Sequence, residues 1–363
     1  MREIDELLEA AADTPEVVVD LGVARANIER AAALTRSHGV ALRPHTKTHK
    51  LPQLARLQLG AGAAGIMVAK LGEAETMADA GLDDVLVGFP LVGDTKLRRL
   101  EALIDRGVRA TVVVDSLEVA EGVARLRRDL PALLELDTGL GRLGYPPGEA
   151  AVEAGRRIQE LDGIALRGVL THEGHVYRRA RDAADVERLT RDAAERCVAV
   201  ARELGLREVS LGASGTFRFA VAQPGVTEVR PGTYVFNDLS LLAIGACELA
   251  DVAAVIVATV VARPERTRVV VDAGSKTLTS DRLGVPDAPA TFGRLWDDGG
   301  TVVRISEEHG VLEVPPSSPL RVGERVALVP NHVCPVVNLA DAVTVVDGDR
   351  VERWPVAARG RVQ

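Results

Sequence analysis

The feature of this chain that most restricts its fold is an alternation of short apolar runs with helical patterns, which repeats from Val40 to about Asp238. The apolar runs are nearly continuous stretches of Val, Ile, Leu and Ala, as in parallel strands that are covered on both faces. Eight such βα units over roughly 200 residues predict a (β/α)₈ barrel of the TIM type. An open doubly wound sheet is the alternative, because periodicity does not report closure. The runs expected as strands are 40–43, 65–70, 84–89, 110–115, 132–137, 165–171, 208–212 and 226–236.

The pattern changes from about Cys247. Short β-branched runs follow, separated by Gly, Pro or Asp turns and without a convincing helix, which predicts a mostly antiparallel β domain. We therefore expect a barrel domain over residues 1–246 and a β domain over residues 247–363. A further strand is predicted at 15–21, so the N-terminal residues are available to join the β domain.

Charge and cysteine content exclude several classes of function. The chain carries 44 Lys and Arg against 52 Asp and Glu, a net charge of −8, which disfavours binding to nucleic acid or to an anionic membrane. No apolar run approaches the roughly 18 residues of a membrane span, and the acidic start is unlike a signal peptide. We expect a cytoplasmic protein. Three widely separated cysteines argue against a disulfide framework.

The end of the first predicted barrel strand carries an unusual basic stretch, Arg43-Pro44-His45-Thr46-Lys47-Thr48-His49-Lys50. In α/β proteins, ligands bind and chemistry occurs at the C-terminal ends of strands. Neighbouring cations disfavour the ammonium form of Lys47 and so favour the free amine that a Schiff base needs. The alternative is a basic surface loop that binds phosphate or nothing.

Other predicted strand ends also carry polar residues. Arg142 lies among glycines, which let a permanently charged group approach a ligand closely, although a structural salt bridge is the alternative. The segment Gly212-Ala213-Ser214-Gly215-Thr216 is a glycine-rich turn suited to a phosphate, where a tight turn alone would look similar. An amine and a phosphate site on one face are what pyridoxal 5′-phosphate needs. The further candidates for contact with such a cofactor are His172, His175, Tyr177 and Tyr234.

The second half contains a possible metal pair in Pro330-Asn331-His332-Val333-Cys334-Pro335. In a strand, His332 and Cys334 would point to the same side and could reach one ion. An imidazole with a thiolate favours zinc, with manganese or magnesium as alternatives. A buried cysteine beside an incidental histidine would give the same pattern. The other polar candidates in this half, which the sequence does not rank, are Asp272, Asp281, His309 and Asp341.

Taken together, several motifs resemble those of the D-threonine aldolase / D-serine dehydratase family. They are the basic stretch around Lys47, the segments 272–276 and 308–310, and the run from His332 to Asp341. The resemblance implies fold-type III pyridoxal-phosphate enzymes with an alanine-racemase-like barrel, assembled as a homodimer that shares its active sites. It also implies that Lys47 carries the cofactor as a Schiff base, that Arg142 lies near it and that residues 212–216 hold its phosphate. Cys334 stands where the aldolases have an aspartate and matches the zinc D-serine dehydratases.

The resemblance leaves two reactions open. In retro-aldol cleavage, a D-β-hydroxy amino acid of the D-threonine type yields glycine and an aldehyde. In dehydration, Lys47 removes the Cα proton and the metal assists loss of the β-hydroxyl, which yields a keto acid and ammonia. We expect cleavage, with Lys47, His332 and Cys334 as the catalytic residues. An amino-acid racemase and a non-catalytic cofactor carrier are the further alternatives; the only tyrosines lie in the barrel half, which disfavours a racemase that uses a β-domain tyrosine.

Overall fold

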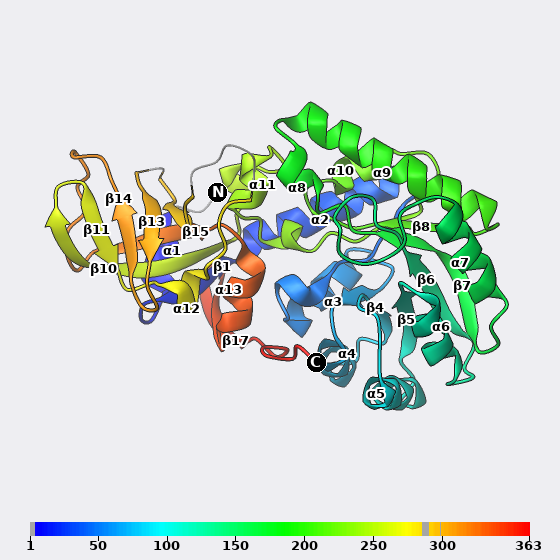
Figure 1. Ribbon diagram of the computed structural model, residues 1–363. Coiled ribbons are helices and arrows are strands. Elements are labelled where there is room, and N and C mark those ends of the chain that lie inside the picture. The colour runs from blue at the N-terminus through cyan, green and yellow to red at the C-terminus, as the bar shows by residue number, and fades with distance from the viewer. Residues whose placement is uncertain (1–3, 285–289, 298) are drawn as a thin grey trace. The chain divides into compact units, whose positions relative to one another are not determined.

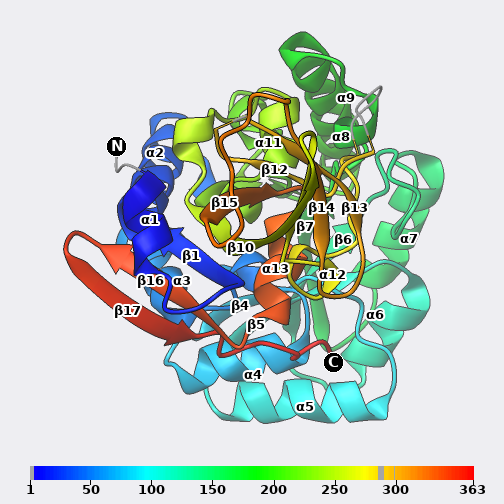
Figure 2. The same cartoon turned by 90° about the vertical axis from the view of Figure 1, so that its left-hand side faces the viewer.

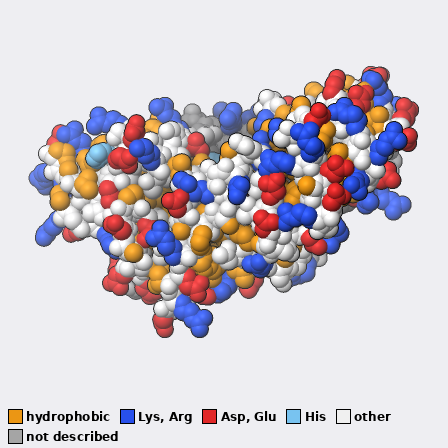
Figure 3. All heavy atoms as spheres, turned by 90° about the horizontal axis from the view of Figure 1, so that it is seen from below, with side chains coloured by type: hydrophobic (Ala, Val, Ile, Leu, Met, Phe, Trp, Pro, Cys, Tyr) orange, Lys and Arg blue, Asp and Glu red, His pale blue; other side chains and the backbone are white. Residues whose placement is uncertain are grey.

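A computed structural model describes residues 4–284, 290–297 and 299–363 of the chain (Figure 1). The chain forms two compact units. The barrel unit consists of residues 29–47, 52–232 and 361–363, and the β unit consists of residues 1–28, 48–51 and 233–360. Acidic and basic side chains are interspersed over the face in Figure 3, in keeping with the modest net charge. No helix in the described part of the chain is long and apolar enough to cross a membrane.

Eight parallel strands make up the core of the barrel unit, in the order β2-β9-β8-β7-β6-β5-β4-β3. The ring closes between β2 and β3, where His45 bridges to Met67 in parallel register and the Met67 amide donates to the Pro44 carbonyl at 2.8 Å. The predicted closed barrel is therefore confirmed, and the open sheet is excluded. The strands are β2 (Ala41–Leu42), β3 (Ile66–Val68), β4 (Asp84–Val87), β5 (Arg109–Val114), β6 (Leu130–Glu135), β7 (Ile164–Thr171), β8 (Glu208–Leu211) and β9 (Glu228–Val229).

Helices cover the outside of these strands (Figure 1). Each strand is followed by a segment that returns to the other end of the barrel, as the alternating sequence pattern requires. The helices are α2 (Leu21–Ser37), α3 (Pro52–Gly60), α4 (Leu71–Asp79), α5 (Asp94–Asp105), α6 (Leu117–Ala124), α7 (Glu149–Gln159), α8 (Val176–Arg179), α9 (Ala183–Glu203) and α10 (Phe217–Ala220). The strand expected over 226–236 is shorter than predicted, because the chain leaves β9 at Arg230.

The inside of the barrel is filled by side chains. Successive strands from β3 to β7 contribute one layer of buried apolar residues, namely Met67, Leu86, Val113, Leu133 and Leu170. Such a layer makes the barrel a solid core rather than a pore, so polar groups gather where the strands end.

The β unit is built on a nine-stranded sheet in the order β11-β14-β13-β12-β15-β10-β1-β16-β17. All pairs are antiparallel except β1 with β16. The hairpin of β16 and β17 forms one edge (Figure 2). The nine strands of the sheet are β1 (Glu16–Asp20), β10 (Ala254–Glu265), β11 (Arg268–Val271), β12 (Gly293–Leu295), β13 (Thr301–Ile305), β14 (Gly310–Glu313), β15 (Arg325–Pro330), β16 (Ala342–Asp347) and β17 (Arg350–Pro355).

The expectation that this half contains no helix is wrong. The chain after Cys247 holds α12 (Ser275–Leu278) and α13 (Val333–Leu339), which are 4 and 7 residues long. The β unit also contains α11 (Leu239–Ala243), a 5-residue helix that precedes Cys247. One or two turns are too short to produce a recognisable hydrophobic period. The N-terminal helix α1 (Ile4–Ala10) packs Leu7 against the same apolar core as β1 and β10.

Candidate active site

Lys47 lies in a single turn of 3₁₀-helix, η1 (Thr46–Thr48), which begins four residues after the end of β2. The Thr46 hydroxyl donates to the Met67 carbonyl at 3.0 Å and ties this turn to the neighbouring strand. Burial and then the positive charge of Lys47 lower the pKa of two imidazoles, His45 and His172, the latter to about 3. The amine therefore lies among neutral histidines, the buried His45 and the partly buried His172, at the C-terminal end of the barrel.

The loop after β6 is organised by Asp137. Its carboxylate accepts hydrogen bonds from the amides of Gly139, Leu140 and Gly141 at 2.8 to 3.1 Å. Burial raises the pKa of Asp137, but these amide donors outweigh it and the pKa is lowered overall. Gly141 has φ 71°, which favours glycine, and Arg142 follows it with its side chain half exposed.

Glu135 and Arg230 are two buried ionisable residues that the sequence analysis did not single out. Arg230 is 3% exposed and donates to the Ser210 hydroxyl at 2.5 Å and to the Thr171 carbonyl at 2.8 Å. Burial raises the pKa of Glu135 to about 7, although the Arg230 and Arg142 guanidinium groups oppose the shift. An arginine inside an apolar run is the signal that could have identified Arg230, because burying that charge requires partners.

Glu173 is a second buried acid that the sequence analysis missed. Its carboxylate is fully buried and accepts from the Gly212 amide at 3.0 Å and from the Thr216 hydroxyl at 2.5 Å. Burial raises the pKa of this carboxyl. The Gly212 amide and the Thr216 hydroxyl, which were predicted to hold phosphate, therefore bind Glu173 and fix the turn after β8. The His172 Nδ1 atom also hydrogen-bonds to this turn, at the Gly212 carbonyl.

The hydroxyls of Tyr177 and Ser214 also lie at this turn, where they accept hydrogen bonds from backbone amides. The Tyr177 hydroxyl accepts from the Gly215 amide at 2.8 Å, and the Ser214 hydroxyl accepts from the Gly232 amide at 3.0 Å. A hydroxyl can accept one hydrogen bond and donate its own proton at the same time. These contacts orient Ser214 and Tyr177 around the predicted phosphate turn. His175 comes directly before α8, and burial lowers its pKa.

Three predicted site residues belong to the β unit, namely Tyr234, His332 and Cys334. Tyr234 is 4% exposed and lies in the turn η2 (Thr233–Val235). The expectation that His332 and Cys334 share a strand is wrong, because β15 ends at Pro330. His332 is the N-cap residue of α13 and Cys334 lies in the first turn of that helix.

Despite this change of secondary structure, the histidine and the cysteine interact. Burial lowers the pKa of His332, but the negative charge of Cys334 and the Asp281 carboxylate outweigh it and raise that pKa. The His332 Nδ1 atom lies 3.0 Å from Asp281 Oδ2. The Cys334 sulfur lies 3.2 Å from the hydroxyl of Thr48, the residue after Lys47 in the chain.

A neighbouring aspartate fixes the start of α13. Asp238 is buried and accepts from the amides of Leu241 at 3.2 Å and Val333 at 3.1 Å. Burial raises its pKa to about 6. Asp238 thereby holds the backbone between His332 and Cys334. Three acidic residues of this half were left unranked by the sequence, and among the described residues only Asp281 is hydrogen-bonded to His332 or Cys334. Asp272 instead accepts hydrogen bonds from Thr14 and Thr259, and Asp341 forms an ion pair with Arg359.

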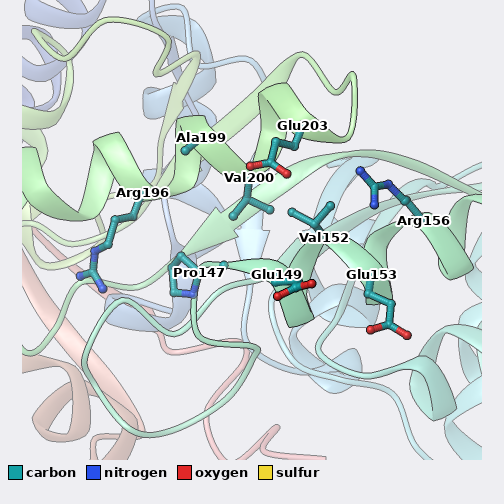
Figure 4. Close-up of a pocket in the computed structure, with 10 residues that line it drawn as sticks. Pro147, Glu149, Val152, Glu153, Arg156, Arg196, Ala199, Val200 and Glu203 are labelled. Atoms are coloured by element: carbon teal, nitrogen blue, oxygen red, sulfur yellow. The ribbon is translucent and has the colours of Figure 1, made fainter.

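A cavity of about 620 Å³ lies elsewhere in the barrel unit, along α7 and α9 (Figure 4). Its lining mixes charges of both signs, since it contains Glu149, Glu153 and Glu203 together with Arg156 and Arg196. None of the predicted cofactor or metal residues lines it.

Comparison with known proteins identifies the family. Residues 19–240 match the alanine racemase N-terminal domain, and residues 253–346 match a putative serine dehydratase domain. The chain belongs to the alanine-racemase-like pyridoxal-phosphate enzymes. D-threonine aldolase of Arthrobacter sp. is 33% identical over 97% of this chain and 94% of its own, and D-threo-3-hydroxyaspartate dehydratase of Delftia sp. is 34% identical over 89% and 91%. The crystal structure of D-threonine aldolase from Filomicrobium marinum has a TM-score of 0.87 at 31% identity, covering 98% of both chains.

These relatives are lyases, and so is this member of the alanine-racemase-like family. The barrel unit fits pyridoxal phosphate because it combines an amine, Lys47, with buried cationic and hydroxyl groups at the same strand ends. The pair in the β unit fits a divalent metal, because it brings an imidazole and a cysteine sulfur, two ligand types that such ions accept, to the start of α13. No cluster of three or more His, Cys, Asp or Glu side chains suited to a metal occurs within 4–284, 290–297 and 299–363.

Proposed function

We propose that this lyase cleaves D-β-hydroxy amino acids of the D-threonine type into glycine and an aldehyde, with the help of a divalent metal. The observation that carries the proposal is the similarity to D-threonine aldolase over 97% of the chain. The position of Lys47 at a barrel strand end supports it, because the cofactor chemistry requires an amine there.

Pyridoxal phosphate, when bound, supplies an electron sink for a bond that breaks at the substrate Cα. Lys47 would hold it covalently, and the hydroxyls of Ser214 and Tyr177 would bind its phosphate, with Gly215 and Thr216 shaping the turn. His172 is neutral near pH 7, because its pKa is about 3, and so offers a flat uncharged surface and a hydrogen bond rather than a cation. Arg142 and Arg230 supply the permanent positive charge that anionic groups of cofactor and substrate need.

In the β unit, His332 and Cys334 would hold the metal, with zinc preferred because a thiolate ligand selects it over magnesium; manganese and magnesium are the alternatives. Asp281 binds Nδ1 of His332, which leaves Nε2 as the ligand nitrogen. A bound divalent ion supplies a Lewis acid for the β-oxygen of the substrate.

Dehydration is the second candidate. Its support is the 34% identity to D-threo-3-hydroxyaspartate dehydratase, together with the Cys334 ligand type. In that reaction Lys47 would remove the Cα proton. Racemisation has less support, because residues 247–363 contain no tyrosine to serve as a second acid and Tyr234, the one tyrosine of the β unit, is 4% exposed in the turn η2. A carrier role has less support, because a carrier needs no metal pair.

We further propose that the enzyme is a cytoplasmic homodimer, as the family resemblance implies. Its mass in solution, measured by light scattering, should be twice the 38.5 kDa of the chain. A monomeric mass in the fully active enzyme would contradict the assembly.

The deciding experiment is to incubate the holoenzyme with D-threonine and identify the products. Glycine with acetaldehyde indicates cleavage, whereas 2-oxobutyrate with ammonia indicates dehydration. The Lys47→Ala variant serves as the control, since it removes the amine and leaves the rest of the barrel unchanged. The absence of both product pairs, with cofactor and metal supplied, would contradict the proposal.

A further inference from the structure

The turn after β8, residues 212–216, is held by side chains that follow the neighbouring strand β7. Thr171 and Leu211 form the last pair of the parallel β7–β8 ladder. Beyond this pair, the Gly212 amide donates to Oε2 of Glu173 at 3.0 Å, and the Gly212 carbonyl binds Nδ1 of His172. Buried backbone groups need partners where a ladder ends. Two consecutive residues after β7 supply them for both polar groups of Gly212.

The Glu173 carboxylate also reaches the other end of the turn. The Thr216 hydroxyl donates to Oε1 of Glu173 at 2.5 Å, and Thr216 and Glu173 are both 0% exposed. Each carboxylate oxygen therefore binds one end of the turn, Gly212 or Thr216. Without this carboxylate, a buried N–H and a buried O–H would lose a partner, which disfavours the present conformation of the turn.

The bridge between Glu173 and Thr216 does not depend on a negative charge. Burial raises the pKa of Glu173 and so favours the neutral acid. A neutral carboxyl can donate to the Thr216 hydroxyl, whose own proton then reaches the Ala213 carbonyl, 3.1 Å away. A neutral carboxyl also repels a nearby phosphate less than a carboxylate does. The bridge is therefore compatible with an anion site at this turn.

The turn is confined from two further sides. A Cβ atom on Gly212 would lie 2.8 Å from Nη2 of the buried Arg230, so only glycine lets the backbone approach this guanidinium so closely. The Gly215 amide donates to the Tyr177 hydroxyl at 2.8 Å. The position of the turn therefore determines where the hydroxyls of Tyr177 and Ser214 lie.

We propose that Glu173 is a positioning residue for the cofactor phosphate: by bridging Gly212 and Thr216 it fixes the turn that presents the hydroxyls of Ser214 and Tyr177 to the phosphate. This inference rests on the proposed phosphate site and adds a residue that acts on it through the turn. The Schiff base at Lys47 forms with or without a phosphate on the cofactor. Glu173 should therefore control the preference for pyridoxal 5′-phosphate over pyridoxal, which lacks the phosphate.

The test is to free the full-length enzyme of cofactor and titrate it with pyridoxal 5′-phosphate or with pyridoxal, following the visible band. Glu173→Ala should raise Kd for pyridoxal 5′-phosphate by about 10- to 100-fold, the loss expected for two hydrogen bonds, and Kd for pyridoxal by less than about twofold. Glu173→Gln should bind both compounds within about threefold of the unmodified enzyme. Its amide oxygen can accept from Gly212 and its amide nitrogen can donate to Thr216.

Thr216→Val provides a second, milder variant in case Glu173→Ala does not fold. It keeps the shape of the side chain and removes one of the two contacts, so Kd for pyridoxal 5′-phosphate alone should rise by about 3- to 10-fold. Thr190→Val is the matched control. The Thr190 hydroxyl is equally buried but donates to the Val186 carbonyl within α9, so both Kd values should stay unchanged.

The outcomes separate this inference from the phosphate site on which it rests. Equal losses of affinity for the two compounds in Glu173→Ala and Thr216→Val, or a lower melting temperature with an unchanged ratio of Kd values, would limit Glu173 to a general structural role. If Ser214→Ala weakens binding of pyridoxal 5′-phosphate and these two variants do not, the phosphate site stands and the positioning role is overturned. If Ser214→Ala also leaves the ratio unchanged, the proposed phosphate site itself is wrong.

Discussion

Removal of the Asp281 carboxylate should weaken metal binding without disturbing the fold. Asp281 Oδ2 lies 3.0 Å from His332 Nδ1 and fixes which ring nitrogen faces the metal. The backbone carbonyl of Asp281 separately accepts from the Asn331 side chain at 2.9 Å. The segment thus stays anchored when its side chain is changed.

The size of the effect follows from exposure. Loss of a carboxylate that orients a metal-binding histidine typically costs about 10- to 100-fold in affinity. The Asp281 side chain is 49% exposed, so water screens the interaction and the lower end applies. We expect Asp281→Ala to weaken zinc binding about tenfold, equivalent to about 1.4 kcal/mol, and Asp281→Asn to weaken it less, because an amide oxygen can still accept from Nδ1.

The assay is competition for Zn²⁺ against a chromophoric chelator, run on the enzyme with its cofactor bound. Asp341→Asn is the matched control: it also removes one carboxylate from the β unit, but Asp341 pairs with Arg359 and not with His332. The visible cofactor band should be the same in all variants. If Asp281→Ala binds zinc as tightly as the unmodified enzyme, the orientation of His332 does not depend on this contact and the reasoning is refuted.

Three further predictions concern the barrel and the metal. Lys47→Ala should abolish the visible absorbance of the yellow holoenzyme, and a borohydride-reducible adduct that persists in it would place the cofactor on another lysine. Cys334→Asp should shift metal preference from zinc toward manganese or magnesium and raise cleavage relative to dehydration; unchanged preference, with full activity after chelation, would leave the pair without a metal role. The pKa of Glu135 is raised from 4.5 to about 7, so the folded state keeps a proton that the unfolded state loses, and stability falls as pH rises through that window. Glu135→Gln should therefore gain urea stability over the unmodified enzyme between about pH 5 and pH 8, by at most about 3 kcal/mol, and a gap that does not change with pH would contradict this.

The order of strands and helices in the barrel was predictable because it depends on local periodicity. The predicted run before His172 ends at Thr171, where β7 ends, and the predicted run before Lys47 ends one residue beyond β2, at Arg43. Both ends follow from the rule that a polar residue does not readily continue a strand that is buried on both faces. The polar candidates at these ends could be named for the same reason. In the β unit, α13 was taken for a strand, because seven residues carry too little periodic signal to separate the two.

Contacts between residues far apart in the chain were decided only by the tertiary structure. Closure of the barrel depends on the pairing of His45 with Met67, which no hydrophobic period encodes. Asp281 meets His332 across 51 residues, and only the folded chain distinguishes it from the other acids of the β unit. Glu135 and Arg230 are ordinary charged residues in the sequence, and their perturbed environment arises from burial at the ends of β6 and β9. Local sequence fixes which segments become strands, whereas the energetics of a site depend on which distant groups desolvate and bind one another there.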